Sequence, residues 1–477
     1  MNRVIQVFCL TMFSVISSQA IASPSRETEQ LLTHGTWIVA AQQIFSEART
    51  LNRHEPAIAQ GQIRAGLIDD ALITINGTHA VSRVWLVSEL IRKSPALPET
   101  TRAQLFKQAV QTAQANAHTD LAAGDFTKLA LLSVREGNIE VGKTLFTEAI
   151  LSAQKGQGEN SAGLQRITEE LARAPLSELK GWMLTELIEA LPSSSADKLA
   201  FPCIDLLSVA GRLEEPKHYP ILLEYAQRGI ANISRDGVQN NAAAALAEVK
   251  LELGLLDEAR ALPPALSAKV AARNGQLAEA QAIIQDMPQG LYVDLAQDTY
   301  QAVIRHAFQR GDLAAAEFFI SHPVRDLPAV QLANWQTLAQ HQLQAGQPQR
   351  SDESDARSVE VLPRLSAAQD VYGPHVQTVA HLAIALQRKG RQKQAQQVIQ
   401  VAQKLLARIS DRRIDDQIEA QLGVAAALWW TDQRPAAHYS ILQAYQKVQQ
   451  MPEDDYSAVR RKARQLAVLG NAIVDLI

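Results

Sequence analysis

The sequence predicts an all-α fold, an α-solenoid or superhelix of stacked antiparallel helical hairpins, and three observations support this prediction. A turn pattern built on glycine recurs along the chain. Hydrophobic residues make up 47% of the chain and aromatic residues only 5%, and much of the apolar content is Ala and Leu, which favour helix–helix contacts. Strand signals are nearly absent, because the single Asn76-Gly77 pair has helical patterns on both sides and is better explained as a connector between helices.

In the recurring pattern a helical stretch ends at Gly, and a small residue follows five positions later. Gly adopts the left-handed conformation that ends a helix at little cost. The small residue lets the second helix lie close against the first. The variant Asp432 with Ala437 lacks the glycine. The other pairs are Gly66 with Ala71, Gly137 with Gly142, Gly254 with Ala259, Gly275 with Ala280, Gly311 with Ala316, Gly346 with Ser351, and Gly390 with Ala395.

The clearest hairpin surrounds Gly390. Apolar residues recur at spacings of three and four on both sides of the turn, as expected for two helices that bury facing stripes. Before the turn they are Val379, Leu382, Ala383 and Leu386; after it they are Ala395, Val398, Ile399, Ala402, Leu405 and Leu406.

The stretch from Leu382 to Ala395 resembles the middle of a tetratricopeptide repeat, as do residues 246–259 and 308–316. In that family the turn glycine precedes the packing alanine by the same interval. The resemblance implies a helical-hairpin solenoid whose concave surface binds a partner.

The chain departs from the regular family pattern. The family period is about 34 residues, whereas neighbouring turn glycines here are 21, 36 or 71 residues apart in different places. Pro288 and Pro323 end two of the second helices early. The resemblance is therefore to a divergent, tetratricopeptide-like solenoid.

The first residues are typical of a secretory signal peptide. Arg3 supplies positive charge, residues 4–16 form a mostly apolar core, and Ala20-Ile21-Ala22 is an A-x-A site, so cleavage is expected after Ala22. The apolar core is too short to predict a membrane span, and no other stretch approaches the length of a transmembrane helix. We therefore expect a periplasmic or secreted protein from a Gram-negative bacterium.

Composition shifts suggest how the chain divides. We expect a signal peptide at 1–22, N-terminal helical repeats at 23–191, middle repeats at 192–346, a flexible polar joint at 347–374, and tetratricopeptide-like hairpins with a capping helix at 375–477. The C-terminal helix carries an apolar face at Ala463, Leu466, Leu469, Ile473 and Leu476, and a basic run, Arg460-Arg461-Lys462, on the opposite, solvated face.

Charge and cysteine content restrict the function further. The formal net charge is −4, and nucleic-acid binding would require a basic domain or stripe. After signal removal only Cys203 remains, so no disulfide forms within the mature chain. We expect a buried, inert thiol there, because free Cys is among the most buried residue types.

No sequence motif indicates a cofactor or a metal. His-Glu-x-x-His, Gly-x-Ser-x-Gly, phosphate-loop and Gly-x-Gly-x-x-Gly patterns are absent. The only Glu-Ser pair, Glu353-Ser354, lies in a polar stretch with no Gly-rich segment after it, which argues against a lytic transglycosylase. We therefore expect no catalytic residues.

The only dense aromatic cluster is Trp429-Trp430 with His438-Tyr439 and Tyr445. It is explained as hairpin core, as a protein-binding hot spot, or as a sugar platform; the first is favoured because aromatic residues at helical spacing are usually packed. Adjacent helical residues cannot both face one core, so one of the two Trp side chains is expected to be exposed. The candidate partner-binding residues are Trp429, Trp430, Arg434 and Tyr439.

Together these features favour an exported, non-catalytic adaptor or scaffold that holds a protein partner in a solenoid groove. The alternative is a helical carbohydrate-active envelope enzyme similar to the α/α-toroid lyases.

Overall fold

The computed structural model describes residues 24–33, 36–51, 56–94, 97–117, 119–155, 162–191, 198–255, 264–287, 295–368, 370–410 and 412–476. These residues form α-helices joined by short turns, with one 3-10 helix at Pro216–His218 and no strand among them. The predicted all-α fold of stacked helical hairpins is thus confirmed. The expected signal peptide and its cleavage site lie outside the described residues.

The chain divides into two compact units. Unit 1 combines residues 1–67 with residues 370–477, so it is built from both ends of the chain, and unit 2 is residues 68–369. The helices of unit 1 are α2 (Pro24–Thr33), α3 (Trp37–Leu51), α4 (Pro56–Arg64), α21 (Gly373–Arg388), α22 (Gln392–Leu406), α23 (Ile414–Trp430), α24 (Arg434–Gln449) and α25 (Tyr456–Leu476).

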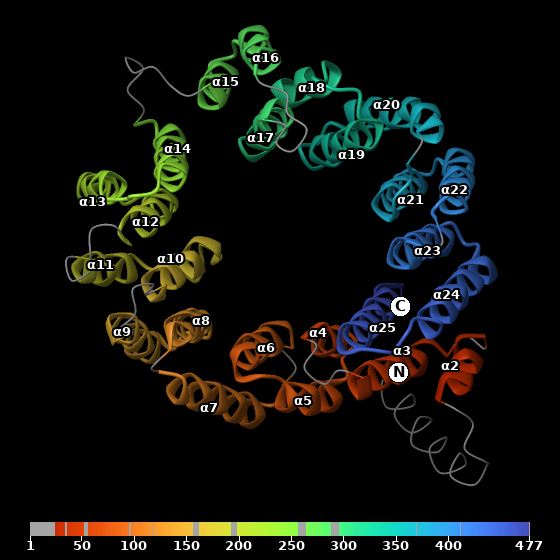
Figure 1. Cartoon of the computed structure of the whole chain (residues 1–477), viewed down its shortest axis with the longest axis horizontal. Coiled ribbons are helices and arrows are strands. Elements are labelled where there is room, and N and C mark those ends of the chain that lie inside the picture. The colour runs from red at the N-terminus through yellow and green to blue at the C-terminus, as the bar shows by residue number, and fades with distance from the viewer. Residues whose placement is uncertain are drawn as a thin grey trace. The chain divides into compact units, whose positions relative to one another are not determined.

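Unit 2 consists of consecutive helices that pack mainly against their neighbours in sequence, as in a repeat protein, and Figure 1 labels them. They are α5 (Ile68–Gly77), α6 (Ala80–Lys93), α7 (Glu99–Ala115), α8 (Asp120–Arg135), α9 (Ile139–Lys155), α10 (Gly163–Arg173), α11 (Gly181–Ala190), α12 (Ala200–Arg212), α13 (Tyr219–Ala231), α14 (Asp236–Glu252), α15 (Pro264–Arg273), α16 (Leu277–Gln285), α17 (Leu295–Gln309), α18 (Leu313–Ser321), α19 (Pro328–Gln344) and α20 (Pro348–Ala367).

The predicted glycine turns are present in the structure. All seven turn glycines have positive φ, between 69° and 84°, and Asp432 adopts the same conformation at 62°. At Gly390 the two closing hydrogen bonds run from the Gly390 N–H to the Gln387 carbonyl, 2.9 Å, and from the Arg391 N–H to the Leu386 carbonyl, 2.9 Å. This is the Schellman arrangement that satisfies the last carbonyls of a helix. The small residue after the turn is fully buried at Ala71, Ala280, Ala316, Ser351, Ala395 and Ala437; Ala259 lies outside the described residues.

The predicted polar joint at 347–374 is wrong, because residues 348–367 form α20, the partner of α19. Ser351, Ser354 and Ser358 are buried, and their hydroxyl groups donate hydrogen bonds within the hairpin. Ser351 donates to the Ala339 carbonyl at 2.6 Å, and Ser354 donates to Oε1 of Gln342 at 2.8 Å. Polar composition therefore marks a close helix–helix contact here.

The division between units falls after residue 67 and before residue 370, which differs from the expected boundaries at 191 and 346.

The C-terminal helix is not a terminal cap. Its predicted apolar face is buried, but it packs against α3 and α4 from the other end of the chain as well as against α24 (Figure 1). Phe45 of α3 lies between two glycines: a Cβ on Gly61 of α4 would be 2.4 Å from its ring, and a Cβ on Gly470 of α25 would be 2.6 Å from it. Only glycine therefore allows this approach.

The basic run on α25 is also less exposed than predicted. Lys462 is buried, and its ammonium group lies 2.6 Å from a Glu453 carboxylate oxygen and donates to the Gln449 carbonyl at 3.1 Å. Arg461 pairs with Asp415 of α23 at 2.6 Å. A buried ammonium requires such compensation, so part of the basic run ties α25 to its surroundings.

The turn glycines give a direct test of the hairpin design. Gly311 has φ of 70° and nothing within 4 Å of its Cβ position, so Gly311→Ala changes only backbone strain and should destabilise the chain by about 1 kcal/mol. Gly124, inside α8, meets only an ordinary contact at 3.4 Å with the Arg166 side chain. Gly124→Ala should therefore leave stability unchanged or raise it by up to about 1 kcal/mol.

The midpoint of urea unfolding, followed by helical circular dichroism, measures both variants. Equal shifts for Gly311→Ala and Gly124→Ala would contradict the role of the left-handed turns.

Candidate functional site

The structure separates the two adjacent tryptophans at the end of α23. Trp429 packs against the core of unit 1, where its ring meets Trp37 of α3 edge-on at 5.4 Å between centroids and stacks on His438 at 5.9 Å. Arg434 covers the Trp429 ring at 3.7 Å. These two candidate residues thus join α23 and α24 to the first helices of the chain.

Trp430 points away from this cluster and is 45% exposed, which confirms that one of the pair is exposed. The Arg388 guanidinium, at the end of α21, lies 4.7 Å from the centre of its ring. Tyr439 is 62% exposed on α24. The structure therefore brings Trp429 and Arg434 together in the packed junction, whereas Trp430 and Tyr439 are exposed on different helices, α23 and α24.

Trp430 lies at a groove of about 430 Å³ in unit 1, which we call the Trp430 groove. It runs over α21, α23 and α25, with Ile441 contributed by α24. Its apolar part consists of small and aliphatic side chains, which suits close approach by a partner backbone. The lining residues are Gln377, His381, Glu419, Leu422, Gly423, Ala425, Ala426, Trp430, Ile441, Val468, Asn471, Ala472, Asp475 and Leu476.

Polar groups occupy the remainder of the groove wall. Burial raises the pKa of the Glu419 carboxyl, and the neighbouring Asp416 and Asp415 carboxylates raise it further. Asp475 pairs with Arg64 of α4 at 2.8 Å, and the same arginine donates to Asn471. The α4 helix from the first part of the chain therefore fixes the α25 side of the groove.

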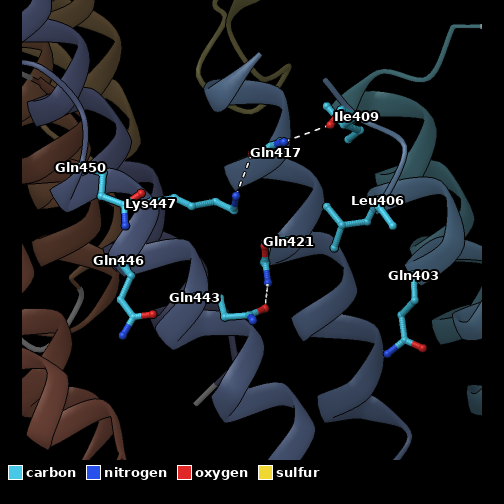
Figure 2. A pocket seen from close by; sticks show the side chains of 10 residues that line it. Gln403, Leu406, Ile409, Gln417, Gln421, Gln443, Gln446, Lys447 and Gln450 are labelled. Carbon is cyan, nitrogen blue, oxygen red and sulfur yellow. Dashed lines mark hydrogen bonds between the residues drawn. The ribbon is translucent and has the colours of Figure 1, made fainter. Parts of the chain in front are cut away.

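A second groove of unit 1 lies between α22, α23 and α24 and is lined mainly by glutamine (Figure 2). Sequence reasoning missed it, because glutamine on a helix usually marks solvent exposure. The available signal was the run of polar side chains on one face of α24, at Gln443, Gln446, Lys447 and Gln450.

A half-buried carboxylate holds helices that support both grooves. Glu47 of α3 accepts hydrogen bonds from Thr28 of α2 at 2.6 Å and from Tyr445 and Gln449 of α24, each at 2.9 Å. Burial raises the pKa of Glu47, and these donors and the Lys462 ammonium partly oppose that rise. Glu47 thus connects the N-terminal helices with α24 and α25.

The raised pKa predicts a pH dependence of stability. Between the ordinary value of 4.5 and the raised pKa, the folded chain binds more protons at Glu47 than the unfolded chain does. Stability therefore falls as pH rises through this window. Glu47→Gln removes the titrating group, so its thermal midpoint should fall less than that of the wild type between pH 4.5 and neutrality. Parallel pH profiles for the two proteins would contradict this assignment.

Cys203 on α12 is buried, and burial raises the pKa of its thiol to about 12. A thiol with so high a pKa is protonated at neutral pH and is a poor nucleophile. The expectation that this thiol is buried is confirmed.

The described residues contain no group of three or more His, Cys, Asp or Glu side chains arranged to hold a metal ion. None of their helices combines the length and apolar content needed to cross a bilayer.

Comparison with known proteins gives little further information. No protein-family model matches the chain, and no curated protein matches it. Among solved structures, Ton1535 from Thermococcus onnurineus NA1 is 13% identical with a TM-score of 0.27, over 86% of this chain and 97% of that chain. A circular tandem repeat protein with novel repeat topology and enhanced subunit contact surfaces is 12% identical with a TM-score of 0.18, over 95% of this chain and 88% of that chain. TM-scores this low establish no shared fold, so the helical-repeat assignment rests on the helices and turns described above.

Proposed function

We propose that this chain is an exported, non-catalytic scaffold that holds a segment of a partner protein in the Trp430 groove. The export signal expected at residues 1–22 and the tetratricopeptide-like hairpins support a periplasmic adaptor of a Gram-negative envelope. The single observation that carries the proposal is the exposed Trp430 indole at a groove with an apolar floor.

Trp and Arg are the residue types that most often dominate binding energy at protein interfaces, where they fill pockets that exclude water. Trp430 lines the groove, and the Arg388 guanidinium lies 4.7 Å from the centre of its ring. The small side chains at Ala426 and Ala472 are partly exposed and leave room for a partner backbone. A segment that places an apolar side chain beside the indole would bury surface that is now exposed to water, and burial of apolar surface favours association.

A second candidate function is a carbohydrate-active enzyme, and one feature of the same groove favours it. Glycosidic bond cleavage uses a carboxyl group whose surroundings raise its pKa, and burial raises the pKa of Glu419. The indole of Trp430 would then stack on a sugar ring. Turnover of an envelope glycan that disappears in Glu419→Gln would establish this function in place of the scaffold.

Site-specific photo-crosslinking in the host tests the scaffold. A photoreactive p-benzoylphenylalanine at Trp430 or His381, both at the groove, should crosslink to one protein in envelope fractions. The same group at Tyr439, which is exposed outside the groove, serves as the matched control and should give no such product.

In the chain without the photoreactive group, Trp430→Ala should reduce partner recovery at least tenfold while Tyr439→Ala retains it. A crosslinked partner that appears equally from position 439, or recovery unchanged in Trp430→Ala, would contradict a binding site at this groove. Trp429→Ala is not a suitable probe, because Trp429 belongs to the packed junction.

A further inference from the structure

The second groove of unit 1 has a composition unlike that of the Trp430 groove. It measures about 480 Å³ and has one charged group. The lining residues are Gln403, Leu406, Ala407, Ile409, Gln417, Gln421, Gln443, Gln446, Lys447 and Gln450. Figure 2 shows the α24 side chains on one side, Gln403 and Leu406 on the other, and Gln417 and Gln421 between them.

Hydrogen bonds hold the floor of this groove in place. The Gln417 amide donates to the Ile409 carbonyl at 2.9 Å, and its oxygen accepts from the Lys447 ammonium at 2.8 Å. The Gln421 amide donates to Oε1 of Gln443. Gln417 and Gln421 are both buried, so a ligand meets a polar floor that is already ordered and has little side-chain entropy left to lose.

Each carboxamide offers a donor and an acceptor together, which is also what every residue of a polypeptide backbone offers. Along α24, Gln443 and Gln450 are seven residues apart, which at about 1.5 Å per helical residue is roughly 10 Å. Three residues of an extended peptide span about the same distance, at about 3.3 Å each. Gln443, Gln446 and Gln450 can therefore follow an extended backbone through successive hydrogen bonds.

The positive charge of Lys447 determines which ligand side chain the groove favours. Lys447 is the one ionic group among the described residues that line it, and its hydrogen-bond partner on the floor, Gln417, is neutral. A carboxylate placed at Lys447 would form a charge-assisted hydrogen bond, which is stronger than one between neutral groups.

From these features we propose that the glutamine groove binds an extended polypeptide segment that carries an acidic residue. The Asp or Glu carboxylate pairs with Lys447, and the glutamines of α24 bind the backbone on either side of it. Both grooves border α23 and α24, but they share no lining residue, so the two sites can fail separately.

Other ligand classes fit less well. A sugar ring is usually bound against an aromatic side chain, and none is present among the ten lining residues. A nucleic acid requires several cations along its backbone, and these residues supply one.

Display of random twelve-residue peptides against the chain of residues 23–477 tests the proposal. The enriched peptides should contain Asp or Glu at one shared position. Their affinity, measured by fluorescence anisotropy, should fall at least tenfold in Lys447→Met and at least fivefold in Gln446→Ala/Gln450→Ala, whose side chains are both exposed. N-methylation of the peptide backbone beside the acidic residue should also weaken binding at least fivefold.

Two controls separate this site from its surroundings. Lys404→Met, which removes an exposed lysine of α22 that does not line the groove, should leave affinity unchanged, and so should Trp430→Ala. Enrichment without acidic residues, unchanged affinity in both Lys447→Met and the double glutamine variant, or no enrichment at all would overturn the proposal. Peptides whose binding depends on Trp430 alone would overturn it and would instead support the Trp430 groove.

Discussion

The contact on which unit 1 depends is the packing of Phe45 between two glycines that are about four hundred residues apart in the sequence. Gly61 belongs to α4 and Gly470 to α25, and a methyl group at either position would overlap the ring. The fully buried ring joins three helices from opposite ends of the chain into one hydrophobic cluster. Removal of this apolar surface from water is the main favourable contribution to the free energy of packing. The hydrogen bonds to Glu47 are directional and restrict how these helices are oriented.

The positions of both grooves depend on this packing of α3 and α4 against α25. The Trp430 groove needs α25 as one wall, and α25 is positioned by α3 and α4, through Phe45 and the Arg64–Asp475 pair. The glutamine groove needs α24, whose Tyr445 and Gln449 are bound to Glu47. A chain that lost its first helices would therefore lose the support of both surfaces, even though none of those helices lines either groove.

Local chemistry explains what could be predicted from the sequence. The left-handed conformation that ends a helix is determined by a few neighbouring residues. The glycine turns and the Asp432 variant are therefore predictable from the sequence. The turn at Glu214, with φ of 55°, was missed because it has neither a glycine nor a small residue five positions later. The sequence predicts a joint where α20 lies because the buried serines of this helix are polar. The pairing of α3 with α25 depends on contacts distant in sequence, and periodicity alone could not show which tryptophan faces the core.

Hydrogen exchange of the Gly470→Ala variant tests most directly whether the two chain ends form one unit. Amides in a cooperative unit lose protection together. The account predicts faster exchange in α3, residues 37–51, as well as in α25, with α8 in unit 2 unchanged. Faster exchange confined to α25, with α3 exchanging as in the wild type, would contradict it.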